Sequence, residues 1–152
     1  AVDAAQLMAN SAKKAGIDIE EVREPNDGYW SNVWNNDAKG WCACYWGGRP
    51  AETMMFSAAY VAESKWNDTM WKTTDSAVKF NQLVKDARKE LDESKKRDIL
   101  YECQRLIYDD GGLLCPLFNS YVSANSKKIA HGKIAANWDS DGAKCVERWW
   151  FA

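Results

Sequence analysis

The stretch TDSAVKFNQLVKDARKELDESKKRDILYECQRLIYDDGG, residues 74–112, carries the clearest structural signal in the chain. Apolar residues recur in it at helical spacing along two successive runs, and charged residues fill the opposite positions, which predicts two amphipathic helices. Thr74 or Asp75 would cap the first helix and Asp92 the second. Gly111 follows where the second helix must end. The predicted apolar stripes are Phe80, Leu83, Val84, Ala87 and Leu91 in the first helix and Ile99, Leu100, Cys103, Leu106 and Ile107 in the second.

A helix followed at once by a strand is predicted at the start of the chain. Residues 3–15 have helical periodicity, and Gly16 stands where a left-handed C-terminal cap is wanted. Ile17 and Ile19 then alternate with acidic residues, which predicts a short half-buried strand before Pro25. This succession favours the α/β class.

The rest of the chain adds short elements to this pattern. A short aromatic-faced helix is predicted after Asp27, and another helical turn after Pro50. Residues 41–46, 113–118 and 121–124 are rich in apolar or aromatic residues near turn-forming ones, so they predict strands. The run 113–118 is the most apolar and is expected to be buried.

The composition excludes several classes of function. The chain has 152 residues, the size of one domain, and a formal net charge of −2 with acidic and basic residues interspersed. No basic surface is therefore expected, and nucleic acid is not a predicted partner. No apolar run has the about 20 residues of a membrane span, and the start lacks the basic and apolar regions of a signal peptide. Such a start is expected of a mature secreted protein or of a chain cut from a longer one.

Metal and cofactor chemistry has little support in the sequence. The five cysteines are too dispersed for a zinc site of the CxxC type, and His131 has no second histidine at ligand spacing. No metal and no cofactor is therefore predicted. Cys103 and Cys115 have strongly apolar surroundings and are expected to be buried thiols. The other cysteines are Cys42, Cys44 and Cys145.

Few residues are candidates for catalysis. His131 lies in a Lys-rich turn and is expected to be a surface residue rather than a general base. Cys42 and Cys44 are two apart in a predicted strand, so both side chains would face the same way. They could line a cleft, form a redox pair or supply half of a soft-metal site. Cleft lining is favoured, because no nearby Lys or His lowers the pKa of either thiol.

Arg49 is a charged candidate for ligand binding. It follows the end of the predicted strand 41–46, where its planar guanidinium could hold a ligand carboxylate through two hydrogen bonds. The competing interpretation is an ion pair with Glu52 or another surface acid. The nine tryptophans of the chain suggest a binding cleft or an interface between lobes as readily as core packing.

The ordered set of motifs resembles one family, the extracellular solute-binding proteins (family 5) that serve dipeptide, oligopeptide and opine ABC importers. Together the motifs cover most of residues 4–131. In chain order they are Ala4-Ala5-Gln6-Leu7 through Ala15-Gly16-Ile17, Glu24-Pro25-x-Asp27-Gly28-Tyr29-Trp30, Gly40-Trp41-Cys42-Ala43, Trp66-Asn67, the helix pair through Leu91-Asp92 with Arg97 and Gln104, and Gly111-Gly112 before Cys115-Pro116-Leu117-Phe118.

This resemblance implies a fold of the α/β class, part of the C-terminal lobe of a two-lobe, type II periplasmic-binding-protein-like architecture. Residues 1–131 would form part of the C-terminal ligand-binding lobe. Residues 132–152 would form a terminal segment that returns toward a first lobe absent from this chain, so the chain is expected to be a fragment. Proteins of this kind close two lobes on a ligand by hinge motion.

The resemblance also implies a ligand site. In the family, the strand with the Gly-Trp-Cys-Ala motif lines the cleft, so Trp41, Cys42, Ala43 and Cys44 are expected to bind ligand. Peptide binders have an aspartate for the ligand's amino terminus at the position of Cys44, and its replacement here favours an opine-like or modified peptide. Arg49 joins this predicted site on its local chemistry alone.

The function expected from the resemblance is that of the substrate-binding component of an ABC importer, and not that of an enzyme. It would capture a peptide-like or opine-like solute in the periplasm of a Gram-negative bacterium and deliver it to membrane permease subunits. Two alternatives stay open. The same fold could act as a ligand sensor, or a thiol enzyme could use Cys42 or Cys44.

Overall fold

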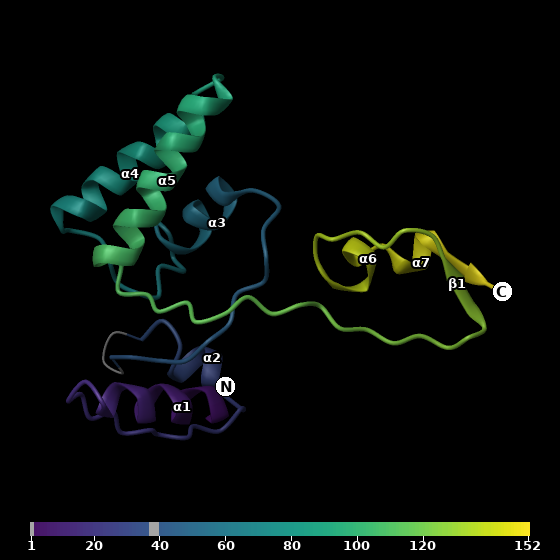
Figure 1. Cartoon of the computed structure of the whole chain (residues 1–152), viewed down its shortest axis with the longest axis horizontal. Coiled ribbons are helices and arrows are strands. Elements are labelled where there is room, and N and C mark those ends of the chain that lie inside the picture. Colours follow the sequence, from purple (N-terminus) through teal and green to yellow (C-terminus); the bar gives the residue numbers. More distant parts are fainter. Residues whose placement is uncertain (1, 37–39) are drawn as a thin grey trace. The chain divides into compact units, whose positions relative to one another are not determined.

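A computed structural model describes residues 2–36 and 40–152 of the protein. The chain divides into two compact units, Ala1–Trp46 and Gly47–Ala152. The first unit contains helices α1 (Val2–Lys13) and α2 (Tyr29–Asn32). The second unit contains α3 (Glu52–Ala59), α4 (Asp75–Ala87), α5 (Glu93–Asp110), β1 (Ile129–His131), α6 (Asp139–Ala143), α7 (Cys145–Arg148) and β2 (Trp149–Phe151) (Figure 1).

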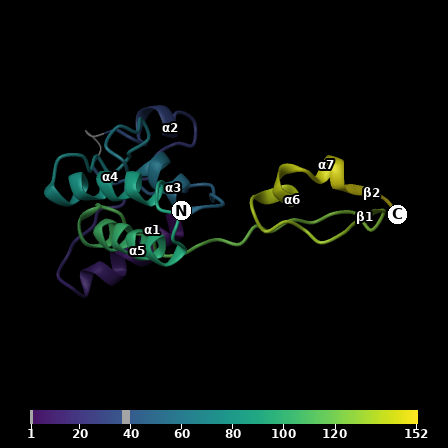
Figure 2. The same cartoon turned by 90° about the horizontal axis from the view of Figure 1, so that it is seen from above.

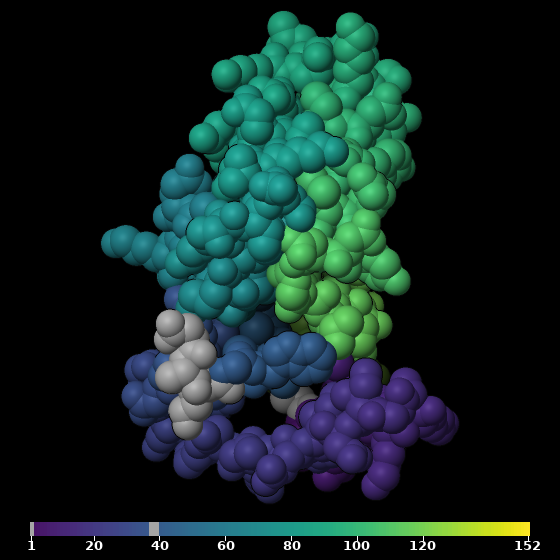
Figure 3. Space-filling model, turned by 90° about the vertical axis from the view of Figure 1, so that its left-hand side faces the viewer, coloured from purple at the N-terminus to yellow at the C-terminus, as the bar shows by residue number. Residues whose placement is uncertain are grey.

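Helices α4 and α5 lie side by side and form the main packed layer of the second unit (Figures 1 and 2). The predicted caps are confirmed. The Thr74 side chain accepts a hydrogen bond from Ala77 N, and the Asp92 side chain accepts from Ser94 N and Lys95 N. In the space-filling view the regions of α4 and α5 lie in direct contact (Figure 3).

The core of the second unit lies where α4, α5 and α3 meet. Phe80 of α4 is fully buried, and its ring contacts the rings of Phe56 and Trp71 at centroid distances of 5.6 and 5.2 Å. The predicted stripes are confirmed at their centres, but Leu91 is 92% exposed because α4 ends before it. The buried residues of the two long helices are Ala77, Phe80, Val84, Ala87, Cys103, Leu106 and Ile107.

A carboxylate at the end of α5 ties this helix to the start of α4. Asp110 Oδ2 accepts hydrogen bonds of 2.7 Å from Trp71 Nε1, Thr74 Oγ1 and Ser76 Oγ. These bonds, that from Ser76 first, lower the pKa of Asp110. The cap residue Thr74 therefore serves two structural purposes, since it also accepts from the backbone of α4.

The strand predictions for 17–24, 41–46, 113–118 and 121–124 are wrong, because these segments have no regular secondary structure. A strand is stable only when its backbone groups pair with a neighbour, and within the described residues no strand lies beside them. Helices hold 43% of the described residues and strands 4%. The α/β two-lobe architecture therefore stays a prediction.

The last part of the chain folds back on itself. Strands β1 and β2 pair antiparallel, with His131 opposite Trp149. Between them the buried Asp141 accepts from Ala135 N (2.6 Å) and Trp149 Nε1 (3.0 Å). The hydrogen bond from the Ala135 amide is the largest cause of the lowered pKa of Asp141. Residues 149–151 thus pair with 129–131, and a domain boundary at residue 131 stays a prediction.

No helix in the described part of the chain combines the length and the apolar character needed to cross a membrane.

The burial of Cys103 gives the first testable prediction. Its thiol is fully buried, as the sequence predicted, and burial raises its pKa to about 11. Cys115 is exposed instead of buried, because the segment 113–118 does not join a sheet.

Iodoacetamide is expected to modify Cys103 roughly 100-fold more slowly than Cys115 in buffer, since reaction requires local opening and a thiolate. Peptide mass spectrometry measures both rates in one sample. Equal rates in buffer would contradict the packing of α5, and urea should remove the difference.

Candidate functional site

The predicted ligand residues fall into two groups in different units of the structure. Trp41, Cys42, Ala43 and Cys44 belong to the first unit, and Arg49 belongs to the second. Each group is described by itself.

The first group lies along an extended segment that contacts α2. Tyr29 Oη donates a hydrogen bond of 2.6 Å to the carbonyl oxygen of Ala43. Partial burial, and then the neighbouring Cys42 and Cys44, raise the pKa of the Tyr29 phenol. Trp41 is 69% exposed, Cys44 is exposed and Cys42 is half-buried.

Aromatic rings hold the end of this segment against α2. Trp30 contacts Trp34 and Tyr45 at centroid distances of 5.7 and 5.3 Å, and Trp34 contacts Trp46 at 6.0 Å. All three pairs have edge-to-face geometry, which rings prefer. In the part of the chain that the structure describes, no three His, Cys, Asp or Glu side chains gather into a group that could hold a metal ion.

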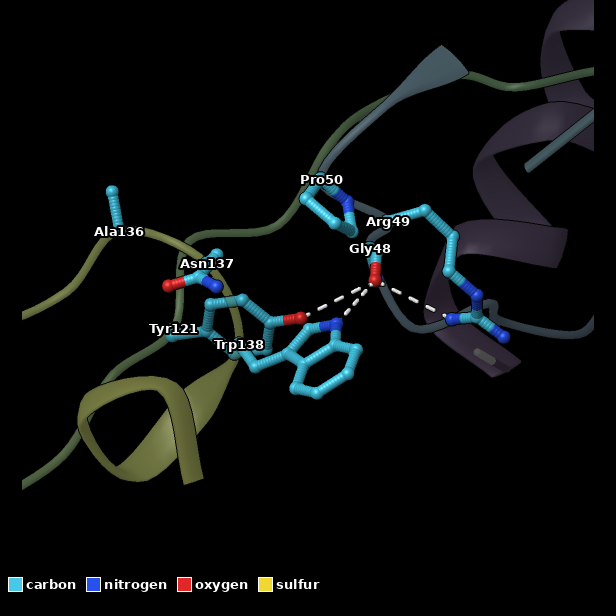
Figure 4. Close-up of a pocket in the computed structure, with 7 residues that line it drawn as sticks. All are labelled: Gly48, Arg49, Pro50, Tyr121, Ala136, Asn137 and Trp138. Carbon is cyan, nitrogen blue, oxygen red and sulfur yellow. Dashed lines mark hydrogen bonds between the residues drawn. The ribbon is translucent and has the colours of Figure 1, made fainter. Parts of the chain in front are cut away.

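Arg49, which forms the second group, lines a pocket of about 320 Å³ in the second unit (Figure 4). Three segments far apart in the sequence form its wall. One is the loop that leads into α3, one is the extended segment after α5, and one is the loop before α6. The residues that line the pocket are Gly48, Arg49, Pro50, Tyr121, Ala136, Asn137 and Trp138.

The backbone of Gly48 is the point at which these segments meet. Its carbonyl oxygen accepts a hydrogen bond of 2.6 Å from Trp138 Nε1, and its N–H donates to Tyr121 Oη at 3.4 Å. Figure 4 shows the side chains of Tyr121, Trp138 and Arg49 converging on this residue. The indole N–H of Trp138 is thus engaged by backbone, whereas the Tyr121 phenol accepts one hydrogen bond and keeps its own O–H donor, and both side chains line the pocket.

The Arg49 guanidinium is held at one nitrogen. Nη1 donates to the carbonyl oxygens of Gly47 (2.7 Å) and Gly48 (3.3 Å). A guanidinium has five N–H donors, so the edge formed by Nε and Nη2 can still receive a carboxylate through two parallel bonds. The predicted alternative, an ion pair with Glu52, does not form, and among the described residues no carboxylate pairs with Arg49.

Trp138 has an unusual backbone conformation, with φ 73° and ψ 160°. This region is adopted almost only by glycine, and other residues there lose about 1–3 kcal/mol of stability. Strained residues of this kind are concentrated at ligand sites. The hydrogen bond to Gly48 fixes the position of the indole ring at the pocket and helps to hold this strained backbone conformation.

Sequence reasoning found Arg49 but missed Tyr121, Asn137 and Trp138. The sequence predicts a strand at Tyr121 and offers no site signal at Asn137 or Trp138. The hydrogen bonds that bring Tyr121 and Trp138 to Gly48 span 73 and 90 residues. No local pattern could have indicated contacts at such a separation.

Comparison of the chain with protein families, with curated proteins and with solved structures finds no match.

Proposed function

We propose that this protein is the substrate-binding component of an ABC importer, which captures a peptide-like or opine-like solute by its carboxylate. The single observation that carries the proposal is the Arg49 guanidinium at the pocket. Its Nη1 is fixed by two loop carbonyl oxygens, and in the described part of the chain no acidic side chain forms an ion pair with this guanidinium. The resemblance of the sequence motifs supplies the class of protein.

Binding without turnover is the chemistry that these groups support. The polar side chains around the pocket are a guanidinium, an amide, a phenol and an indole. Such groups orient and neutralise a ligand through hydrogen bonds. The proposal therefore includes no enzymatic step and no cofactor.

The resemblance extends this proposal to partners and location. The protein would act in the periplasm of a Gram-negative bacterium and deliver its ligand to permease subunits. In that family a second lobe completes the binding cleft, and by the resemblance Trp41, Cys42, Ala43 and Cys44 would line such a cleft.

The role of Arg49 is tested by the variant Arg49→Gln. A charge-assisted bond to a carboxylate is lost in this variant, so affinity for an opine or a dipeptide should fall roughly 10- to 150-fold. Isothermal titration calorimetry of the chain with N-(1-carboxyethyl)alanine and with Ala-Ala measures the change.

The matched control is Arg97→Gln, which removes the same charge from an exposed position on α5. It should bind as the unmodified chain does. An unchanged affinity in Arg49→Gln, or an equal loss in both variants, would reject the proposed site.

A further inference from the structure

We propose that a second pocket, between α4 and the segment that follows α3, binds a small amino dicarboxylic acid, a molecule with two carboxylates and one ammonium group. This site goes beyond the proposed function, because it shares no residue with the pocket at Arg49. Three charged side chains on the wall of the second pocket indicate this class of ligand.

The wall of the second pocket has two sides. One side is a single stripe of α4 and its C-cap, because Asn81, Val84, Lys85 and Arg88 are spaced i, i+3, i+4 and i+7. The other side is the end of α3 and the residues after it, up to Ser64. The volume is about 340 Å³, at the small end of the range of about 300 to 1,000 Å³ for ligand pockets. The pocket therefore suits a ligand of the size of an amino acid.

Two hydrogen bonds link the two sides of the second pocket. Arg88 Nη2 donates to Ser57 Oγ of α3 (2.6 Å), and Ala62 N donates to Asn81 Oδ1 (3.0 Å). The Ser57 hydroxyl in turn donates to the carbonyl oxygen of Thr53 (2.6 Å). The protein's own bonds thus set the shape of the pocket, and a preformed pocket lowers the entropic cost of ligand binding.

The charges on this wall are two cations of α4 and one carboxylate of the facing segment. Lys85 Nζ lies 3.7 Å from Glu63 Oε1, and both side chains are more than half exposed, so this ion pair is weak. In the described part of the chain no carboxylate forms an ion pair with Arg88, and its bond to Ser57 uses one of five N–H donors. The wall therefore has one cation that no protein acid balances.

A ligand with complementary charges has two anionic groups and one cationic group. The head group of an α-amino acid holds an ammonium beside a carboxylate, so it can bind across the weak pair, with the carboxylate at Lys85 and the ammonium at Glu63. Lys85 and Arg88 are separated by about 4.5 Å along the helix axis, a step that a short side chain with a second carboxylate can span. Val61 and Val84 also line the pocket and offer apolar surface to the carbon atoms of that side chain.

The closing experiment titrates L-glutamate into the 15N-labelled chain and follows the backbone amide signals by NMR. The signals of residues 61–64 and 81–88 should shift with a common Kd. L-Glutamine lacks the second carboxylate and glutarate lacks the ammonium, so each should bind roughly 5- to 12-fold more weakly than L-glutamate. The lower value corresponds to an exposed ion pair and the higher value to a charge-assisted hydrogen bond. Equal binding of the three probes would overturn the inference.

The variant Glu63→Gln tests recognition of the ammonium. It should weaken binding of L-glutamate roughly 5- to 12-fold and should not weaken binding of glutarate, because glutarate has no ammonium for Glu63 to bind. A purely structural role of Glu63 would change the binding of both probes alike. Equal weakening of L-glutamate and glutarate would therefore reject the site.

The variant Arg88→Gln tests recognition of the second carboxylate. It should reduce the affinity for L-glutamate toward that for L-glutamine. Arg97→Gln is the matched control, because it removes the same charge from an exposed position on α5 and should leave both affinities unchanged. A preference for L-glutamate over L-glutamine that survives Arg88→Gln would contradict the inference.

The position of the NMR shifts separates this inference from the proposed function. Shifts confined to residues 48–50, 121 and 136–138 would place L-glutamate at the Arg49 pocket, which would overturn the second site and leave the proposed function standing. If L-glutamate shifts neither pocket, the second site is wrong, and the proposed function is then decided by Arg49→Gln with the opine.

Discussion

Replacing Asn67 by aspartate is expected to lower the free energy of unfolding of the second unit by about 3 kcal/mol or more. Asn67 is 1% exposed. Its Nδ2 donates to the carbonyl oxygens of Tyr60 (3.4 Å), Val61 (3.3 Å) and Trp71 (3.0 Å). An aspartate in the same place would have no donor for these carbonyls and would direct negative charge at them.

The Asn67→Asp effect should depend on pH. Burial against carbonyl oxygens raises the pKa of the new carboxyl in the folded state, so the folded protein binds a proton more tightly than the unfolded chain. The loss of stability should therefore be larger near about pH 7 than near about pH 4. Urea unfolding followed by circular dichroism at both pH values measures this difference.

The control for Asn67→Asp is Asn119→Asp, the same exchange at an exposed position. It should change the free energy of unfolding by less than about 0.5 kcal/mol. A similar unfolding midpoint for Asn67→Asp and Asn119→Asp would contradict the prediction. It would show that the hydrogen bonds from the Asn67 amide to the three carbonyl oxygens do not stabilise the fold.

Replacing Phe80 by alanine is expected to lower the free energy of unfolding by about 3–5 kcal/mol. The fully buried ring packs between Phe56 of α3 and Trp71, so its loss opens a cavity that three elements must close. The midpoint of urea unfolding should fall by about 1–3 M. Because single domains are stable by only about 5–15 kcal/mol, this change is a large part of the whole.

Val78→Ala is the matched control for Phe80→Ala. Val78 lies on the same helix, but it is 59% exposed, and its truncation should change the free energy of unfolding by less than about 0.5 kcal/mol. Equal effects of the two variants would contradict the orientation of α4.

The helix pair α4 and α5 shows which features can be predicted from local sequence patterns. Phe80 and Val84 repeat at helical spacing, and Asp92 can cap a helix wherever that helix packs, so both features could be predicted from the sequence. The predicted strand at 113–118 failed because an apolar run becomes a strand only beside a partner. Asn67 was noted only as part of a family motif, since nothing local shows that its amide meets three carbonyl groups.

Part of the candidate site could likewise be predicted from the sequence, and part could not. The sequence by itself determined that Arg49 follows an aromatic segment and is a candidate for carboxylate binding, and that α4 and α5 form with their caps. Only the tertiary structure brought Tyr121 and Trp138 to Gly48 across 73 and 90 residues and left the edge of Arg49 open to a ligand. The physical reason is that caps and helical stripes depend on residues within a few positions of one another. A pocket depends on contacts between residues far apart in the sequence, which no local spacing predicts.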